Sequence, residues 1–344
     1  MDLCQLAGEV LAERPADTDP AWSQWSLNSL TRFYRHIEHA EFISRDGKEI
    51  HYGLCRPNEA IAWVVISPGR VESYIKYQEV ALELVAAGYA VAMIDHRGQG
   101  HSSRLTPNPQ QGHVGRFIDY AEDFAEWLEY LQEQFENKNV FLLAHSMGGA
   151  IAMTYLQQVA GRKKYQPSPF SKAALSAPMM GINTAPWPLW LAKPMTRSLA
   201  ALNQLMSPKR YWYAPGTGDY ATEPFAINRL THSETRYDWF SQMYTDLPAI
   251  KVGGPTNHWV AEGVAAADEV VRLASRVEIP VLLLQGDQDI IVATEPQKRF
   301  IDQLPHPQSN LLPVAGAKHE ILMETDAIRN PAMQAILDYF QDEA

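Results

Sequence analysis

Along most of the chain, the apolar positions switch regularly between two spacings. Continuous apolar runs, such as residues 61–67, are typical of parallel strands that are covered on both faces of a sheet. Segments such as 77–87 instead place apolar residues at helical spacing, and Gly88 stands where a helix C-cap would. Alternating strands and helices predict an α/β fold, with a mostly parallel sheet and helices on both faces.

The predicted elements follow one another from residue 40 to the end of the chain. An antiparallel hairpin at 40–56 comes first, because two half-apolar stretches flank the turn residues 45–48. Further strands are predicted at 61–67, 89–94, 140–144, 172–176, 280–285 and 310–314. Helices are predicted at 77–87, 117–135, 148–159, 294–304 and 330–341.

Residues 178–275 break this alternation. They hold five of the nine tryptophans and as many basic as acidic residues, so the rest of the chain carries the whole net charge of -11. We interpret the segment as a helical lid inserted into an α/β core of residues 40–177 and 276–344, with a polar N-terminal leader at 1–39. The opening part of the lid, 178–218, contains no acid. Its basic residues are Lys193, Arg197, Lys209 and Arg210, and one helical face carries Met195, Leu199, Leu202 and Met206.

Composition narrows the class of protein. With 46% hydrophobic and 20% charged residues, the chain can bury a large core and is not disordered. Lys and Arg number 29 against 40 Asp and Glu, so the cationic field that binds nucleic acid is missing. The two cysteines, Cys4 and Cys55, are too few for a disulfide framework or a four-cysteine zinc site.

The sequence also suggests a compartment. Glu9, Glu13 and Arg14 interrupt any apolar run near the N-terminus, so we see no signal peptide. The longest apolar stretch, 85–94, is too short to cross a bilayer. We therefore expect a cytoplasmic protein, and peripheral contact with the inner face of the cell membrane stays open because surface binding needs no spanning segment.

The strongest chemical signal is a serine between a strand and a helix. The apolar run 140–144 leads directly to Ser146, and glycines 148 and 149 begin the next helix. On so tight a turn the hydroxyl projects from the sheet, and the backbone amide of Met147 points into the same space. Small residues are needed on both sides of the turn, and Ala144 and Gly148 satisfy this requirement. Ser146 is therefore the candidate nucleophile.

A serine nucleophile needs a base, and the base needs an anion to hold it. The strand at 280–285 ends in Gly286 and two carboxylates, Asp287 and Asp289, either of which could be the anion or a helix cap. The next strand is followed by His319 at the same edge of the sheet. The order Ser, Asp, His is the one that this architecture requires.

Two further loops complete the candidate site. Residues 67–70, Ser-Pro-Gly-Arg, follow a strand at the position where a second oxyanion-hole amide would come from, and we assign that amide to Arg70. The Arg70 side chain would meet an anionic substrate group if it turned inward. Residues 95–102, Asp-His-Arg-Gly-Gln-Gly-His-Ser, are interpreted as loop-shaping, and the spacing of their histidines fits no standard zinc motif.

Together these motifs resemble the α/β-hydrolase superfamily, and within it the group of serine monoacylglycerol lipases and lysophospholipases. The resemblance covers about residues 42–340 and includes 253–259 as a lid element. It implies Ser146 as nucleophile, Asp289 as acid and His319 as base, with the amides of Arg70 and Met147 as oxyanion donors. Many members have His-Gly at the oxyanion loop, where this chain has Pro68-Gly69.

The resemblance implies hydrolysis of the carboxyl ester of a single-chain lipid, with a lysophospholipid as the leading substrate. The products would be a fatty acid and a glycerophospho-alcohol, formed through an acyl-enzyme without metal or organic cofactor. The alternatives are a monoacylglycerol lipase, a broad carboxylesterase, transfer of the acyl group to a second lipid, and a non-catalytic lipid or small-molecule receptor. Ser146 excludes the hydrolases of this fold that use an aspartate nucleophile at the same turn.

Overall fold

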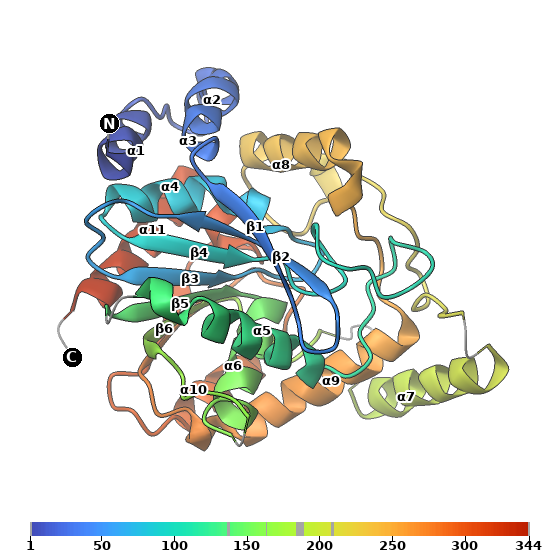
Figure 1. Cartoon of the computed structure of the whole chain (residues 1–344). Coiled ribbons are helices and arrows are strands. Elements are labelled where there is room, and N and C mark those ends of the chain that lie inside the picture. The colour runs from blue at the N-terminus through green and yellow to red at the C-terminus, as the bar shows by residue number, and fades with distance from the viewer. Residues whose placement is uncertain (1, 136–137, 163, 184–188, 208–209, 343–344) are drawn as a thin grey trace.

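A computed structural model describes the chain except for residues 1, 136–137, 163, 184–188, 208–209 and 343–344, and gives no side-chain information for residues 189–193. Its centre is an eight-stranded sheet in the order β1-β2-β4-β3-β5-β6-β7-β8 (Figure 1). The first hairpin and the β2–β4 pair are antiparallel, and all other neighbouring pairs are parallel. The strands are β1 (Glu38–Ile43), β2 (Glu49–Cys55), β3 (Trp63–Ser67), β4 (Ala90–Ile94), β5 (Val140–His145), β6 (Phe170–Ser176), β7 (Val281–Gly286) and β8 (Asn310–Val314).

Two hydrophobic cores lie on opposite faces of the sheet. In β3, Trp63 and Val65 belong to one core, whereas Val64 and Ile66 belong to the other, as the alternation of side chains along a strand requires. The first core is covered by α5 (Ile118–Tyr130), α6 (Met147–Gln158), α9 (Asn257–Arg272) and α10 (Thr294–Asp302), and the second by α1 (Leu3–Ala12), α4 (Gln78–Ala86) and α11 (Asp326–Gln341). This doubly covered sheet is the predicted fold.

The predicted strands after the hairpin agree with the observed ones to within two residues at each end, because a buried strand is marked by its continuous apolar run. Helix α11 begins at Asp326, four residues before the predicted start at residue 330. In that additional turn Asp326 and Arg329 enter buried ion pairs with other elements. Such long-range contacts have no local pattern in the sequence.

The N-terminal segment, which the sequence suggested was a polar leader, is helical and packed. It forms α1, α2 (Ala21–Trp25), a π-helical turn and α3 (Thr31–Tyr34). Trp22 and Trp25 are buried, and the Trp22 ring meets Trp239 edge-on at 6.0 Å. The segment therefore lies between the core and the inserted residues that follow β6.

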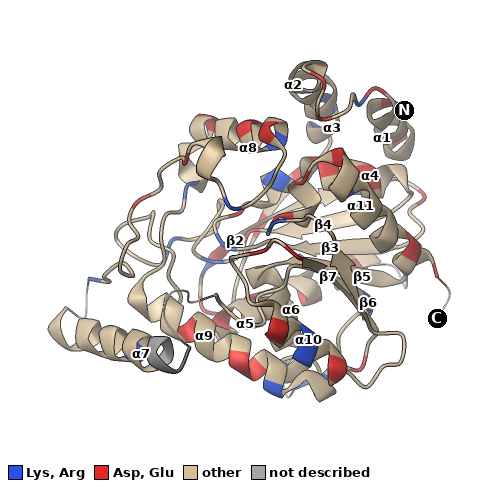
Figure 2. Cartoon of the chain, turned by 180° about the vertical axis from the view of Figure 1, so that it is seen from behind, with Lys and Arg blue, Asp and Glu red and all other residues tan. Residues whose placement is uncertain are grey.

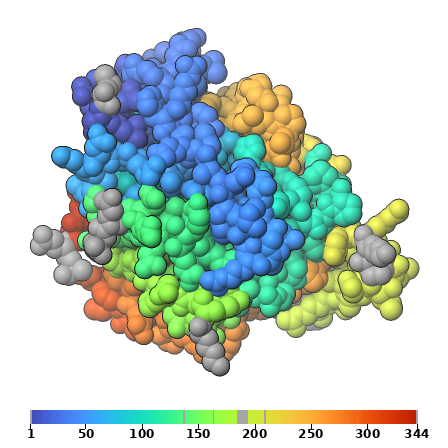
Figure 3. Space-filling model, in the orientation of Figure 1, coloured from blue at the N-terminus to red at the C-terminus, as the bar shows by residue number. Residues whose placement is uncertain are grey.

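The described part of the insertion between β6 and β7 contains three long helices, and they differ in how they are attached to the core. Helix α9 packs its Val270 face into the core beneath the sheet, and α8 (Glu234–Asp246) lies beside the N-terminal helices (Figure 1). Helix α7 (Leu189–Met206) projects from the body of the molecule (Figures 1 and 3). Among the basic residues predicted for this part, Lys209 and the side chain of Lys193 lie outside the described residues.

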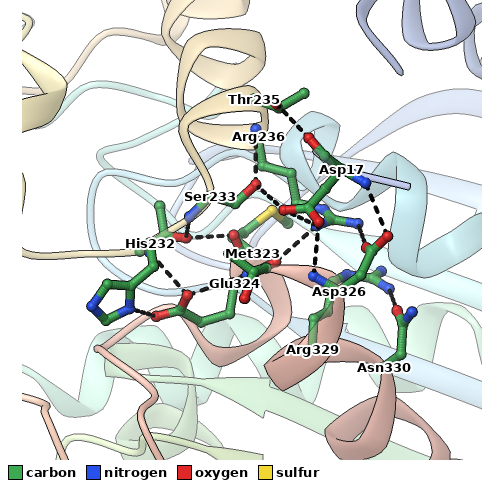
Figure 4. A network of polar contacts seen from close by, with 12 residues as sticks. Asp17, His232, Ser233, Thr235, Arg236, Met323, Glu324, Asp326, Arg329 and Asn330 are labelled. Carbon is green, nitrogen blue, oxygen red and sulfur yellow. Dashed lines mark hydrogen bonds and ion pairs between the residues drawn. The ribbon is translucent and has the colours of Figure 1, made fainter. Parts of the chain in front are cut away.

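Helix α8 is held to the core by a buried cluster of charges (Figure 4). The Arg236 guanidinium donates to both carboxylate oxygens of Glu79 on α4, each at 2.8 Å, and to Asp326 on α11 at 2.7 Å. Arg329 makes a second bidentate pair with Glu83, at 2.7 and 2.9 Å. Because Arg236, Glu79 and Arg329 are fully buried, removing one partner leaves a charge without compensation.

No helix in the described part of the chain is both long and apolar enough to pass through a bilayer.

We expect Glu79→Gln to lower the free energy of unfolding by about 3–5 kcal/mol at neutral pH, because Arg236 and Arg329 lose their buried counter-charge. Urea denaturation followed by circular dichroism measures the loss. The matched control is Lys298→Ala, which breaks the exposed pair of Lys298 with Asp302 and should cost less than about 1 kcal/mol. Equal losses in the two variants would contradict this role of the cluster.

The contacts of Glu79 with its arginine partners also predict that the stability of the fold depends on pH. Burial alone would raise the pKa of Glu79, but Arg329, Arg236 and Arg14 lower it from 4.5 to about 2. The stabilisation is therefore complete above the unfolded pKa and is lost as the pH falls through the folded one. The difference in unfolding free energy between wild type and Glu79→Gln should be constant near neutrality and shrink between pH 4.5 and about 2. A constant difference across this range would contradict the argument.

Candidate active site

Ser146 occupies a strained backbone position between β5 and α6. Its φ of 50° and ψ of -117° lie in a region that residues with a side chain rarely adopt. The turn is held on both sides, since the Ser146 amide donates to Ser176 O at 3.1 Å and its carbonyl accepts from Met179 N at 2.9 Å. The hydroxyl is thereby placed at the carboxyl edge of the sheet, as the sequence predicted.

The glycines around this turn are required by close backbone contacts. A Cβ atom on Gly148 would lie 2.1 Å from Ser67 O, and one on Gly149 would lie 2.7 Å from the Pro178 ring. Gly286 plays a similar part at the end of β7, where a Cβ would approach Ala317 O to 2.6 Å. These positions let the loops that carry the candidate residues come together.

The three predicted triad side chains form one hydrogen-bonded chain. Ser146 Oγ lies 2.9 Å from His319 Nε2, and His319 Nδ1 lies 2.7 Å from Asp289 Oδ2. All three residues are largely buried, so water competes little for these bonds. The arrangement is that of a serine whose proton can pass to an imidazole held by a carboxylate.

The structure distinguishes the two carboxylates that the sequence left open. Asp289 faces His319, and its second oxygen accepts the amides of Ile291 and Val292 at 2.7 and 3.2 Å. Burial alone would raise the pKa of Asp289, but the bond and charge of His319 and these two amides lower it below its ordinary value. Asp287 instead accepts the amide of Gly316 at 2.7 Å, so it braces the loop before the histidine.

The two amides predicted to form an oxyanion hole are those of Arg70 and Met147. Met147 is the first residue of α6. The loop that carries Arg70 lies close to Ser146, as shown by Gly69, on which a Cβ atom would be 3.2 Å from Ser146 Cβ. In the part of the chain that the structure describes, neither amide has a hydrogen-bond partner. Two unpaired amides next to the serine hydroxyl suit a developing negative charge.

Gln99 holds the oxyanion loop in shape, a role that the sequence indicated only as loop-shaping by residues 95–102. Its side-chain amide donates to Gly69 O at 2.7 Å and to Glu72 O at 2.9 Å, and its oxygen accepts from Val71 N at 3.3 Å. Val71 has a φ of 70°, so this tight turn needs outside support. Gln99 supplies that support from the loop after β4.

A buried charge cluster, which sequence reasoning missed, lies behind the oxyanion loop. The Glu72 carboxylate accepts from Gly69 N at 2.5 Å, Lys76 Nζ at 2.9 Å and Tyr77 Oη at 2.7 Å, and lies 3.0 Å from His145 Nδ1. Lys76 also donates to Glu320, the residue after His319, at 2.6 Å. Burial alone would raise the pKa of Glu72, but Lys76 and His145 hold it well below its ordinary value. The cluster thus joins the loops on either side of Ser146.

Among the described residues, a single group of potential ligands lies close enough together to hold an ion, namely Glu41, Glu49 and His51 on the first hairpin. His51 already contacts both carboxylates, which are exposed. The three residues lie on β1 and β2, at the edge of the sheet, and are therefore separated from the end of β5, where Ser146 lies.

A protein-family model described as "Serine aminopeptidase, S33" matches residues 58–326, which include every candidate residue. The chain belongs to this family of α/β hydrolases. The predicted fold is thereby confirmed, and so is the predicted class of hydrolase.

The similar proteins extend over nearly the whole chain. Lysophospholipase L2 of Escherichia coli K12 is 39% identical over 325 residues, 93% of this chain and 92% of that protein. Monoglyceride lipase of Rattus norvegicus is 23% identical over 88% of this chain and 89% of that protein. A crystal structure of a soluble variant of monoglyceride lipase from Saccharomyces cerevisiae has a TM-score of 0.69 at 20% identity, covering 88% of this chain and 94% of that one. Together with the fold, these relatives support an ester hydrolase.

The triad geometry predicts a sharp difference between the two neighbouring carboxylates. Asp289→Asn should lower kcat by about 10⁴-fold, because the amide cannot hold the histidine in the required tautomer. Asp287→Asn is the control and should change kcat little, since an amide oxygen can still accept the Gly316 proton. Steady-state hydrolysis of p-nitrophenyl butyrate measures both variants.

Ser146→Ala should abolish both this activity and covalent labelling by a fluorophosphonate probe. Labelling that persists in Ser146→Ala, or equal effects of the two Asn variants, would contradict the assignment.

Proposed function

We propose that the protein hydrolyses the carboxyl ester of a lysophospholipid to a fatty acid and a glycerophospho-alcohol. The observation that carries this proposal is the likeness to lysophospholipase L2 of Escherichia coli along almost the full length of both chains. The description of the family model names an aminopeptidase, but membership identifies the fold and its chemistry of acyl transfer rather than a substrate.

The proposed reaction follows from the contacts of Ser146. Its hydroxyl attacks the ester carbonyl while His319 Nε2 accepts the proton, and Asp289 stabilises the imidazolium that forms. The amides of Arg70 and Met147 receive the oxyanion, and the loss of one such donor would cost about 3 kcal/mol of barrier. His319 then returns the proton to the leaving alcohol, and a water that it activates releases the fatty acid.

Aromatic side chains of the inserted segment pack beside the loop that carries Arg70. An aromatic cluster on α8, comprising Tyr237, Phe240 and Tyr244, packs close to the oxyanion loop. Tyr244 donates to Val71 O at 3.0 Å, and Lys76 Nζ lies 4.2 Å from the centre of the Phe240 ring.

Hydrolysis of a monoacylglycerol is the second candidate, because monoglyceride lipases are also among the relatives. The deciding experiment compares kcat/KM of the purified protein for lysophosphatidylethanolamine, a monoacylglycerol with the same acyl chain, and p-nitrophenyl butyrate. We expect the lysophospholipid to be the preferred substrate, and free fatty acid rather than a second acylated lipid to be the product. A higher kcat/KM for the monoacylglycerol would overturn the proposal in favour of the second candidate.

We further propose that the protein acts in the cytoplasm and meets its lipid at the inner face of the cell membrane through α7. This helix contains no acidic residue (Figure 2), and its exposed Leu205 and Met206 have 82% and 64% of their surface open to solvent. Arg197 on the same helix is exposed and suits an anionic lipid surface.

Flotation with vesicles that contain phosphatidylglycerol tests this contact. Leu205→Glu should reduce the bound fraction several-fold, because a charge replaces an inserted apolar side chain. Ile61→Glu is the control, because Ile61 is also an exposed apolar residue, with 61% of its surface open to solvent, but lies outside α7. This variant should float like the wild type. Equal flotation of all three proteins would remove α7 as the contact.

A further inference from the structure

Arg70, in the loop next to Ser146, carries a positive charge that no carboxylate of the described chain neutralises. The buried arginines Arg97, Arg236 and Arg329 each form ion pairs with Asp or Glu, whereas no such pair among the described residues involves the partly buried Arg70. Burial lowers the pKa of Arg70 to about 10, so the side chain stays protonated at neutral pH. A partly buried cation without an anion is costly unless a ligand supplies one.

The Arg70 guanidinium is held in place on one side and left open on the other. Its Nη1 donates to Gly253 O at 3.0 Å, and its carbon lies 5.5 Å from the centre of the Trp259 ring. A Cβ on Gly112 would come within 3.3 Å of Nη1, so a glycine leaves the room that the guanidinium occupies. In the described chain, the Nε and Nη2 atoms of Arg70 have no hydrogen-bond partner, and neither atom is fully buried. These donors are thus available to a ligand.

The position of Arg70 also fits the dimensions of a lysophospholipid. Its backbone amide is the proposed oxyanion donor, and about six covalent bonds separate that nitrogen from the guanidinium carbon. In a lysophospholipid that is acylated at a terminal glycerol carbon, about six bonds likewise separate the ester carbonyl carbon from the phosphorus. A substrate whose carbonyl oxygen meets the Arg70 amide is therefore long enough for its phosphate to reach as far as the Arg70 guanidinium.

The nearby carboxylates of Glu72 and Glu262 make their hydrogen bonds with groups other than Arg70. Glu72, two residues along the same loop, is engaged by Gly69, Lys76, Tyr77 and His145. Glu262 on α9 accepts the amide of Phe117 at 2.9 Å.

We propose that the Arg70 guanidinium binds the phosphodiester of the substrate and so selects lysophospholipids over neutral monoacylglycerols. The inference rests on the proposed function and adds a specificity-determining side chain to it. A planar guanidinium donates two parallel hydrogen bonds to phosphate oxygens, and it gains nothing comparable from a glycerol hydroxyl. Because Gly253 O and the Trp259 ring already orient it, little side-chain entropy is lost on binding.

The test compares the ratio of kcat/KM for lysophosphatidylethanolamine to that for a monoacylglycerol with the same acyl chain. Arg70→Gln should lower this ratio about tenfold or more, because the charge and the fork are lost. Arg70→Lys should retain part of the preference, because it keeps the charge. A general effect of these variants on the loop that carries Arg70 would change kcat/KM for both substrates alike, because both are esters, and would therefore cancel in the ratio.

Arg104→Gln is the matched control for the loss of a loop arginine. Arg104 also lacks a carboxylate partner among the described residues, but it donates to Gly100 O at 2.8 Å and Ala249 O at 2.5 Å. We expect this variant to keep the wild-type ratio. A ratio in Arg70→Gln that stays within twofold of wild type, or an equal fall in Arg104→Gln, would overturn the inference.

A second measurement separates this inference from the proposed function. Glycerophosphoethanolamine should bind the catalytically inactive Ser146→Ala protein in a calorimetric titration, and the additional change Arg70→Gln should weaken that binding about tenfold. If the wild type cleaved only monoacylglycerols, the proposed function would fail, whereas Arg70-dependent binding of the phosphodiester would still support the anion site. Equal binding with and without Arg70→Gln would overturn the site even if lysophospholipids were cleaved.

Discussion

The strained turn at Ser146 is the constraint on which the arrangement of this site depends. A residue with a side chain adopts its backbone angles only at a cost of about 1–3 kcal/mol, so the surrounding structure must over-determine the turn. It does so through bonds to Ser176 and Met179 and through the close contact of Gly148 with β3. In return, the hydroxyl stands clear of the sheet, and the first amide of α6 points into the same space.

Buried charges connect the loops around this turn. Glu72 and Lys76 link the oxyanion loop to His145 and Glu320, the residues next to Ser146 and His319 in the chain. Glu324 extends this bracing, because it accepts the amide of Lys318 at 2.9 Å and also contacts His232 before α8. Charges in a protein interior are tolerated only with partners, so each pair fixes the relative position of segments that are far apart in sequence.

The inserted helices consequently divide into a fixed part and a projecting part. Helix α8 is tied to the core through Arg236, and α9 is one of the helices that pack against one face of the sheet. Helix α7 has its contacts chiefly with α9 and leaves Leu205 and Met206 in solvent. The elements next to the candidate site are therefore tied to the core, whereas the apolar surface proposed to meet the membrane lies on a helix that projects from the body of the molecule (Figure 1).

The sequence by itself determined the order of strands and helices in the α/β core and the local form of the Ser146 turn. Both follow from short-range properties, namely the spacing of apolar residues and the small size of Ala144, Gly148 and Gly149. It also placed the candidate serine, carboxylates and histidine at one edge, because parallel strands end together.

Only the tertiary structure decided which side chains meet. Asp287 and Asp289 are two residues apart in one turn, and their opposite directions depend on the path of the loop against Gly316 and His319. The packing of the N-terminal helices, the Glu72 cluster and the inward turn of Arg70 likewise depend on partners more than a hundred residues away or on other loops. Such contacts leave no period or motif in the chain, because hydrogen bonds and ion pairs are set by distance in space rather than by separation along the backbone.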